Sequence, residues 1–446
     1  MKKKYILFSV IFFVIVSTIV LTLKKNDFRT FTKLKTLIPK DLKIFIKERS
    51  RDYLYYTDIN LSFVREYSIK SKQKKNFLIK EYNNKLLNLQ GPRAYLGSNE
   101  DNIFLATRNG LLSYSNINNF IDKENFKLKN IKTNIKNIIN YTEFFTDNTY
   151  GIKGMMIDND YIYLSLSNEI SNDCWAISVI KADLNLDNLI FSYIFKHNQC
   201  VKRENKYGEF QAIQSGGVMS DFDSENFLLT TGDFRFRDLA QDDKSIFGKI
   251  LLVNKKSGKI KIISKGHRNA QGIYFDKKKK IIFSTEHGPF GGDEININKN
   301  IDDYKNFGWP ISSYGEHYPS VPKEVYEKAP LYKSHLKYGF VEPIKHFIPS
   351  IGISQILKAN NSFGQYDNEN YFFASMGYKK GDYAGRANTL SIHQIVFDKN
   401  YEKILFEDRV RLNERVRDII FLKNKNSILA FLEKKGSLIL LSYDQK

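Results

Sequence analysis

Two arginines near the end of the chain have the type and spacing of an anion-binding pair. Arg415 and Arg417 are two residues apart in a strand-like segment, so both side chains should point to the same face of the strand. Guanidinium groups bind carboxylates bidentately and stack on flat π-systems. On a buried face two such cations repel each other unless an anion lies between them, which predicts a negatively charged ligand. On an outer, solvated face the pair would need no ligand.

A second group of candidates lies in the stretch Gly266–Pro310. It opens with the turn Gly-His-Arg-Asn-Ala-Gln-Gly at 266–272, and two expected strands follow, Ile273–Phe275 and Ile281–Thr285. A tight corner, Glu286–Pro289, then leads to Gly291-Gly292-Asp293-Glu294, Gly308-Trp309-Pro310 and Ser313-Tyr314-Gly315. The order of these pieces resembles that of the glucose/sorbosone dehydrogenase family. Its members are quinoproteins that oxidise sugars and fold as six-bladed β-propellers.

Further segments follow the family order, so that the resemblance covers about residues 150–440. They are Gly151–Asp158, with Lys153 in place of the family's leucine, Leu228–Asp233, Ala240–Asp242, Gly248–Leu251, Pro349–Ser354 and Glu414–Asp418. Many short strand-like runs separated by turn residues, 14% aromatic residues and almost no long helical pattern also favour an all-β fold. The blade count of six comes from the resemblance alone.

The cofactor of the family is pyrroloquinoline quinone (PQQ), a flat tricarboxylate. The resemblance implies that it is bound by Arg268, Asn269, Arg415 and Arg417. Arg268 would lie against the ring, and the two later arginines would face carboxylates. The alternative for Arg268 is a structural role, in which the guanidinium holds loop carbonyls together.

The resemblance also implies Ca²⁺, which takes oxygen ligands that include backbone carbonyls. In the family, the carbonyls of the corner bind the ion that polarises the quinone, and the matching residues are Gly288 and Pro289. Glu294, with Asp293, matches an acidic pair near a second calcium in some members. Phe307 stands where a tyrosine is usual, which argues against that second site.

Three further positions depart from the family pattern. The enzymes have a histidine base that takes the proton as hydride leaves C1 of the sugar, and Ile213 occupies its position, with Gly217 in place of the arginine that follows. Loss of a positioned base costs about 10²–10⁴ in rate. The family's cofactor-binding lysine falls at Gly377, and Lys379 or Lys380 is a candidate to replace it.

Two functions of different classes therefore remain. The first is a PQQ- and Ca²⁺-dependent dehydrogenase that oxidises an aldose sugar at C1 and passes electrons to an acceptor that the sequence does not identify. The second is a non-catalytic propeller that binds a glycan or a protein partner, which Ile213 favours.

The N-terminus carries an expected membrane helix. The uncharged apolar run Tyr5–Leu23 would span about 28 Å as a helix, close to the hydrocarbon core of a bilayer. It offers no good small-x-small cleavage site, so an uncleaved anchor is favoured over a cleaved signal peptide. The expected parts are an anchor at 1–25, a juxtamembrane spacer at 26–50 and the propeller at 51–446. Because members of the resembled family are exported, the propeller is expected in the periplasm, tethered to the inner membrane by a single pass.

Export also bears on the two cysteines, Cys174 and Cys200. An even pair in a periplasmic protein predicts one disulfide, and two separate buried thiols are the alternative. The runs Trp175–Ile180 and Leu189–Phe195 could pair as strands and bring the two residues together.

The formal net charge is +20, which could attract nucleic acid, anionic lipid or an acidic ligand. No nucleic-acid-binding motif accompanies it, so nucleic acid is not an expected partner. The lysines are instead expected to be scattered and solvated, as in the turn Lys277–Lys280. Arg235 and Arg237 form a second alternating pair to which the resemblance gives no role.

Overall fold

The computed structural model describes residues 57–444 together with residues 39 and 42. Within 57–444 it leaves gaps at 74, 85–92, 123, 140–149, 159, 205–209, 320, 322, 361–362, 364–368 and 378–388. The chain divides into two compact units, Met1–Leu54 and Tyr55–Lys446. The expected membrane helix at Tyr5–Leu23 lies outside the described residues, as does nearly all of the spacer. Among the residues that are described, no helix is long and apolar enough to cross a membrane.

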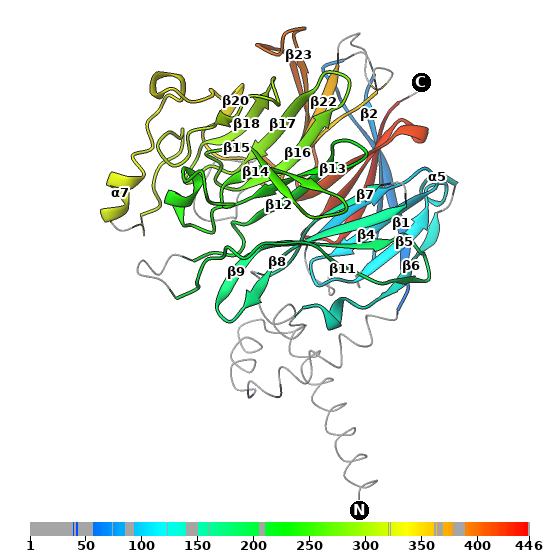
Figure 1. Cartoon of the computed structure of the whole chain (residues 1–446). Coiled ribbons are helices and arrows are strands. Elements are labelled where there is room, and N and C mark those ends of the chain that lie inside the picture. The colour runs from blue at the N-terminus through cyan, green and yellow to red at the C-terminus, as the bar shows by residue number, and fades with distance from the viewer. Residues whose placement is uncertain are drawn as a thin grey trace, which may run out of the picture. The chain divides into compact units, whose positions relative to one another are not determined.

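The second unit is built from β-strands, as its β-branched and aromatic runs predict, and apart from the short β10 (Asn188–Leu189) and β19 (Lys305–Asn306) these pair antiparallel. Its described residues contain six groups of four strands (Figure 1). The first and second groups are β3 (Ala94–Ser98), β4 (Asn102–Thr107), β5 (Leu112–Asn116) and β6 (Asn125–Thr133), and then β7 (Gly151–Asp158), β8 (Tyr161–Ser171), β9 (Cys174–Asp183) and β11 (Ser192–Lys196). The third and fourth are β12 (Gly216–Asp221), β13 (Asn226–Thr231), β14 (Lys249–Asn254) and β15 (Ile260–Lys265), and then β16 (Ala270–Asp276), β17 (Ile281–Glu286), β18 (Asp293–Asn298) and β20 (Lys345–Phe347). The fifth is β21 (Ile353–Lys358), β22 (Asn370–Ser375), β23 (Ser391–Phe397) and β24 (Ile404–Arg411), and the sixth is β25 (Val416–Leu422), β26 (Ser427–Leu432) and β27 (Ser437–Tyr443) with β2 (Phe77–Asn83).

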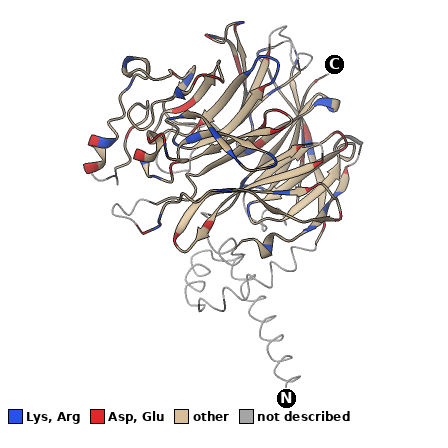
Figure 2. Cartoon of the chain, viewed as in Figure 1, with Lys and Arg blue, Asp and Glu red and all other residues tan. Residues whose placement is uncertain are grey.

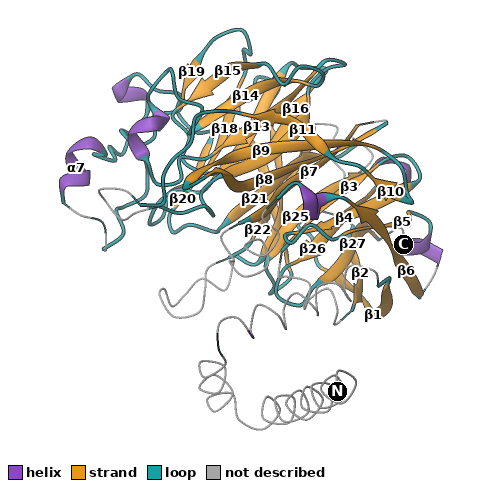
Figure 3. Cartoon of the chain, turned by 60° about the horizontal axis from the view of Figure 1, so that its bottom comes forward, coloured by secondary structure: helices purple, strands orange, loops and turns teal. Residues whose placement is uncertain are grey.

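The first strands of these groups form a closed ring. Each one contacts the first strand of the next group, from β3 through β7, β12, β16 and β21 to β25, and β25 contacts β3. The last group combines strands from both ends of the unit, since β2 pairs with β27 in the register Phe77↔Tyr443 to Asn83↔Ser437. A turned view shows these strands together with β1 (Ile59–Ile69), which pairs with both β2 and β6 (Figure 3). The expected all-β propeller is confirmed, and the six groups agree with six blades.

Apolar side chains fill the spaces between neighbouring blades. Leu228 and Ile250 of the third blade, for example, share one buried cluster with Ile273 and Ile282 of the fourth. Similar clusters join the fourth blade to the fifth, the fifth to the sixth and the sixth to the first. Because the fourth, fifth and sixth blades are held in this way on both faces, the loops that precede their inner strands are fixed relative to one another.

Short elements decorate the blades. They are β10 (Asn188–Leu189), β19 (Lys305–Asn306), α5 (Asn119–Asp122), α7 (Glu324–Lys328) and four 3-10 helices at Ile135–Asn137, Arg237–Ala240, Leu336–Tyr338 and Lys423–Lys425. Basic and acidic residues are interspersed along strands and loops alike (Figure 2). This mixture matches the expectation of scattered lysines, but Lys153, Lys249 and Lys255 are buried rather than solvated.

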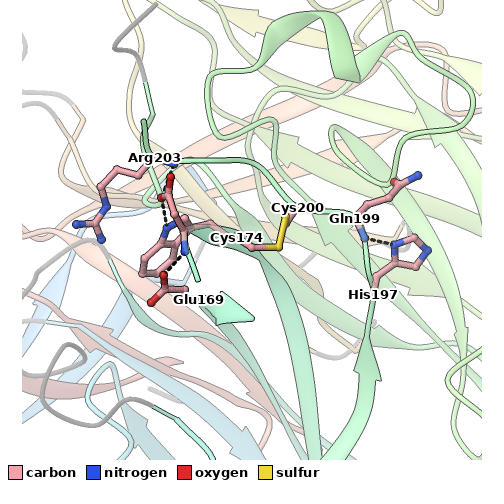
Figure 4. The surroundings of a disulfide bond; sticks show 8 residues. Glu169, Cys174, His197, Gln199, Cys200 and Arg203 are labelled. Carbon is pink, nitrogen blue, oxygen red and sulfur yellow. Dashed lines mark hydrogen bonds between the residues drawn. A yellow bond between two sulfur atoms is a disulfide. The ribbon is translucent and has the colours of Figure 1, made fainter. Parts of the chain in front are cut away.

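The predicted disulfide between Cys174 and Cys200 is present, with a Cα–Cα distance of 5.1 Å (Figure 4). The expected strand pairing also occurs, because β11 pairs with β9. Next to the disulfide, the ring of Trp175 stacks on that of Tyr150. The guanidinium of Arg203 lies over the Trp175 ring, with its Cζ 4.9 Å from the ring centroid. The bond therefore ties the second blade to the segment that leads toward residue 213.

Candidate active site

Two adjoining cavities open where the loops of the blades meet. The first has a volume of about 280 Å³ and is called the corner cavity, because Gly288 and Pro289 line it. The second, the arginine cavity, has a volume of about 220 Å³. They share the lining residues Arg268, His287, Tyr318, Met376 and Arg415. We therefore treat the two as halves of one site.

Most of the residues singled out in the sequence meet here. The arginine cavity is lined by Arg268, Asn269, Arg415, Arg417 and Ile213. They come from the loops and strand ends around β12, β16 and β25, so blades that are distant in sequence supply them. Arg415 and Arg417 do line one cavity, as their alternating spacing predicted.

The His-Arg-Asn turn is held from beneath by Glu286, the last residue of β17. One carboxylate oxygen of Glu286 accepts the backbone N–H groups of Arg268 and Asn269. The other contacts Nδ1 of His267 at 3.1 Å, and Nε2 of His267 lies 2.8 Å from the hydroxyl of Ser264. His267 is therefore fully buried with both ring nitrogens engaged, and it supports the turn rather than facing the cavity.

The guanidinium of Arg268 holds loop oxygens together, the alternative that the sequence left open. Its Nη1 donates to the carbonyls of His287 and Gly288 at 3.0 and 2.7 Å, and its Nη2 donates to Gln214 Oε1 at 3.0 Å. Gln214 is fixed in turn by a hydrogen bond to Asp233, whose buried carboxyl has a raised pKa because of desolvation. The guanidinium thus has a defined position at the junction of the two cavities.

A carboxylate of the protein lies between Arg415 and Arg417, which corrects the expectation that the anion between them is a ligand. Glu433 accepts from Nε of Arg417 at 2.6 Å and lies 3.4 Å from Nε of Arg415. Burial opposes ionisation of Glu433, but Arg417, Arg415 and Arg93 together lower its pKa. The arginine pair is therefore stable without a ligand, although one carboxylate faces three guanidinium groups.

Arg93 belongs to this cluster, although nothing in the sequence had pointed to it. It precedes β3 and lines the arginine cavity. Burial lowers its pKa, and the charge of Arg417 lowers it further. The guanidinium makes no hydrogen bond or ion pair with the residues that the structure describes. This cation, which Glu433 offsets only through space, is a better indication of an anionic ligand than the pair at 415 and 417.

Arg235, which had no assigned role, also lines the arginine cavity. Phe234 and Arg235 both have left-handed backbone conformations, with φ of 51° and 73°. The turn buries the ring of Phe234 against Phe247 while Arg235 reaches the cavity, and Asp233 accepts the N–H of Arg235 at 2.8 Å. Strained backbone of this kind often marks a functional position.

The corner cavity holds the expected calcium ligands. The carbonyl of Gly288 accepts from Arg268, and that of Pro289 lies 3.3 Å from the hydroxyl of Tyr318. The hydroxyl of Ser350 lines the same cavity and has no hydrogen-bond partner in the described part of the chain. These oxygens suit a hard cation, but Ca²⁺ takes six to eight oxygens, so the cofactor and water would have to complete the shell. Arg268 would also have to release Gly288.

Glu294 lies apart from this cavity. Its carboxylate is buried, lies 3.3 Å from Nε2 of His335 and accepts from Asn296. Desolvation raises its pKa. Asp293 does line the corner cavity, where its oxygens accept the N–H groups of Gly288, Ile351 and Ile353. The structure thus does not bring Glu294 together with Gly288 and Pro289, and its described residues contain no cluster of three acidic, His or Cys side chains suited to a metal.

Ile213 projects into the arginine cavity and is 39% exposed there. The one imidazole among the described lining residues is His287, whose Nε2 donates to the carbonyl of Ile353 at 2.6 Å. Burial lowers its pKa, so the ring is neutral near pH 7. Gly377 lines the corner cavity, whereas Lys379 and Lys380 lie outside the described residues.

Comparison with known proteins agrees with this architecture. The sequence profile of the Glucose / Sorbosone dehydrogenase family matches residues 120–440. An uncharacterised protein of Synechocystis sp. is 28% identical over 202 residues, 42% of this chain and 43% of that protein. The aldose sugar dehydrogenase YliI of Escherichia coli is 27% identical over 215 residues, 44% of this chain and 52% of that enzyme. The matches thus span about half the length of these relatives.

Solved structures show the same fold. The soluble aldose sugar dehydrogenase of Escherichia coli, in its apo form, superposes with a TM-score of 0.59 at 19% identity, over 82% of this chain and all of that one. The PQQ-bound aldose sugar dehydrogenase of Streptomyces coelicolor gives 0.52 at 14% identity, over 87% and 99%. Because the family profile matches most of this chain, the chain belongs to the glucose/sorbosone dehydrogenase family.

Proposed function

We propose that the protein is a PQQ- and Ca²⁺-dependent dehydrogenase that oxidises an aldose sugar at C1. The observation that carries this proposal is the convergence of Arg268, Arg415 and Arg417 on one hollow, beside the carbonyls of Gly288 and Pro289. Guanidinium groups suit the carboxylates and the flat ring of the cofactor, and outward carbonyls suit the metal. A solved relative is titled as PQQ-bound, which supports the choice of cofactor.

In this proposal each residue has a separate task. When bound, PQQ with its Ca²⁺ supplies the acceptor for the hydride that leaves C1 of the sugar. Arg415 and Arg417 would hold the anionic groups of the cofactor, with Glu433 fixing their guanidinium planes. Arg268, already anchored by Gln214, would lie against the ring. Asn269 is placed by the same Glu286 that fixes the turn.

Reconstitution tests the proposal directly. The full chain in detergent, mixed with PQQ and millimolar Ca²⁺, should shift the absorbance of the quinone and bind it saturably. Omission of Ca²⁺ should weaken this binding. Oxidation of aldoses is then followed with an artificial electron acceptor. A chain that binds no PQQ under these conditions rules the proposal out.

One observation favours the second function, a non-catalytic propeller that binds a glycan or a protein partner. Ile213 cannot accept a proton, and it occupies the cavity wall where the family's base would stand. Binding of PQQ without turnover of any aldose, under conditions in which a family enzyme turns over, would select this function over catalysis.

We also propose that the propeller is tethered to the inner membrane and faces the periplasm. The apolar run Tyr5–Leu23 supports the tether, and the Cys174–Cys200 disulfide supports an oxidising compartment. Deletion of residues 1–25 should release the protein from washed membranes. If the protein expressed with residues 1–25 is found in the soluble fraction and its N-terminus lies after residue 20, a signal peptide has been removed instead.

A further inference from the structure

Arg93 is a cation of the arginine cavity whose hydrogen-bond donors are unused by the described residues. A guanidinium carries five N–H donors and stays charged in proteins. That of Arg93 makes no hydrogen bond or ion pair with the residues that the structure describes. No Asp or Glu lines the cavity in this part of the chain either. The donors of Arg93 are therefore available to an acceptor that enters from outside the protein.

The two other guanidinium groups around Glu433 are largely engaged. Nε of Arg415 lies 3.4 Å from the carboxylate of Glu433. Its Nη1 donates to the carbonyls of Met376 and Gly377 at 2.9 and 3.2 Å, and its Nη2 lies 3.7 Å from Sδ of Met376. Arg417 directs Nε and Nη2 at one oxygen of Glu433, which leaves its Nη1 without a partner in the described part of the chain. Both arginines add charge to the cavity but few free donors.

The backbone places Arg93 at the cavity wall. Its carbonyl accepts the N–H of Arg108 at 2.8 Å, which continues the pairing of β3 with β4 one residue beyond Ala94↔Thr107. Because side chains alternate along an extended strand, Arg93 and Tyr95 project to the same side of β3. Both line the cavity. The side chain of Arg93 thus begins at a fixed strand end.

Tyr95 and Arg417 lie near Arg93 because β3 and β25 are held together. Oδ2 of Asp418, on β25, accepts the N–H of Leu96, on β3, at 2.8 Å. The residues that precede these two, Arg417 and Tyr95, both line the cavity. The hydroxyl of Tyr95 makes no hydrogen bond among the described residues. Burial raises the pKa of this phenol, although the charges of Arg417 and Arg93 oppose the shift, so the hydroxyl keeps its proton and can donate.

The charges around Arg93 favour an anion. Burial lowers the pKa of Arg93, and the charge of Arg417 lowers it further, while Glu433 acts in the opposite direction. Glu433 is one carboxylate shared by three guanidinium groups. A second carboxylate would meet the free donors of Arg93, Tyr95 and Arg417. Pairs of guanidinium and carboxylate are charge-assisted and often bidentate, which makes them strong and geometrically specific.

We propose that Arg93, with Tyr95 and Arg417, forms a carboxylate-binding site that holds one carboxylate of the cofactor. The inference rests on the proposed function, in which the ligand of the cavity is the flat tricarboxylate PQQ. It adds to that function a binding residue from the first blade, far in sequence from Arg268 and Arg415. Arg415 contributes charge to this site, and Arg93 contributes hydrogen bonds as well.

A ligand that has carboxylates but no quinone tests the site on the unmodified protein. Isophthalate is a flat aromatic dicarboxylate, and isophthalamide has the same shape without charge. Titration calorimetry on the full chain in detergent, with neither PQQ nor Ca²⁺ present, should show that isophthalate binds at least tenfold more tightly. Its binding should weaken as salt increases, because screening acts on the charged pair. Equal affinity for the two compounds overturns the proposal.

Variants assign the effect to Arg93. Arg93→Met should weaken isophthalate binding at least tenfold, and Arg93→Lys, which keeps the charge but loses the planar fork, should give an intermediate affinity. Tyr95→Phe removes one donor and should weaken binding about threefold. Arg411→Met, exposed at the end of β24, is the matched control and should change nothing. An unchanged affinity in Arg93→Met overturns the proposal.

Thermal unfolding separates binding from a structural role. Because the guanidinium of Arg93 makes no bond with the described residues, ligand-free Arg93→Met should unfold at a temperature no lower than that of the unmodified protein. Isophthalate should raise this temperature less in the variant. If Arg93→Met unfolds at a lower temperature and responds to isophthalate as the unmodified protein does, the residue is structural and the proposal is wrong.

The inference and the proposed function fail separately. With Ca²⁺ present, Arg93→Met should lose at least tenfold in PQQ affinity, measured by the absorbance of the quinone. If PQQ binds the variant and the unmodified protein equally, the proposed cofactor stands and the Arg93 site is wrong. If the unmodified chain binds no PQQ but binds isophthalate through Arg93, the proposed function is wrong and the carboxylate site stands without this cofactor.

Discussion

Glu433 forms an ion pair with Arg417, which lines the arginine cavity. Oε2 of Glu433 lies 2.6 Å from Nε and 2.5 Å from Nη2 of Arg417. Both side chains are buried, at 9% and 7% exposure. A buried pair of this kind is costly to break, because removal of one partner leaves the other charge without compensation. The pair therefore sets how much positive charge the cavity offers to a ligand.

Glu433→Gln should destabilise the ligand-free protein and increase the stabilisation that PQQ provides. The variant leaves Arg415 and Arg417 without their anion, so the free energy of unfolding should fall by about 3 kcal/mol. A carboxylate of PQQ can replace the lost charge, so the cofactor should raise the unfolding temperature more than it does in the unmodified protein. Glu407→Gln, which breaks an exposed pair with Lys345, is the control and should cost less than about 1 kcal/mol. A variant as stable as the unmodified protein would show that the pair is not buried in solution.

The same carboxylate predicts a pH dependence. The three arginines hold the pKa of Glu433 below its ordinary value. The stabilisation is therefore fully present above the pKa of an unfolded glutamate, about 4.3, and is lost as pH falls through the lower folded value. The acid limb of a plot of unfolding free energy against pH should be shallower in Glu433→Gln. Superimposable acid limbs would contradict the assignment.

Arg268→Met tests the proposed exchange of partners at Gly288. In the ligand-free protein the guanidinium donates to the carbonyl where Ca²⁺ would bind. Its removal frees this oxygen, so Ca²⁺ should bind the cofactor-free variant at least as tightly as the unmodified protein. PQQ loses a charge-assisted contact worth roughly 1.5–3 kcal/mol, and its affinity should fall at least tenfold. Calorimetry measures both, with Arg411→Met as a control outside the cavity, and an unchanged PQQ affinity would remove Arg268 from the cofactor site.

The disulfide should contribute measurably to stability. Cys174 and Cys200 are 26 residues apart, and closing such a loop stabilises a folded chain by about 3 kcal/mol in the chain-entropy model. Unfolded, unreduced protein should show no free thiol. Reduction, or the double change of both cysteines to serine, should lower the midpoint of urea unfolding. Two labelled thiols in unreduced protein would refute the bond.

The sequence predicted the parts of this protein that depend on local pattern and order along the chain. Alternating apolar runs with short turns gave the all-β fold, and the motif order gave the meeting of Arg268, Arg415 and Ile213 in one hollow. An even cysteine count with an export segment gave the disulfide. These features need no knowledge of which side chains touch.

Contacts across blades could not be predicted in the same way. Glu433 lies opposite Arg415 only because β25 and β26 form a hairpin in which Val416 pairs with Leu432. Arg93 comes from the part of the chain that resembles the family only loosely, so no motif marked it. Lys153 was visible as a departure from the family, but its place in the lining of the arginine cavity was not.

Ile213→His asks whether the missing base limits catalysis. Isoleucine accepts no proton, and the side chain already faces the cavity, so a histidine there would reach the site without a change of fold. His267 cannot serve instead because it is buried between Ser264 and Glu286, and Glu209 lies outside the described residues.

With PQQ and Ca²⁺ bound, the unmodified protein should oxidise aldoses slowly, and Ile213→His should raise kcat by about 10²-fold with a pH profile that reports an imidazole. Ile213→Gln, polar but unable to act as a base, is the control. Fast oxidation by the unmodified protein would mean that another group takes the proton, and tight PQQ binding without turnover in either form would favour the non-catalytic function.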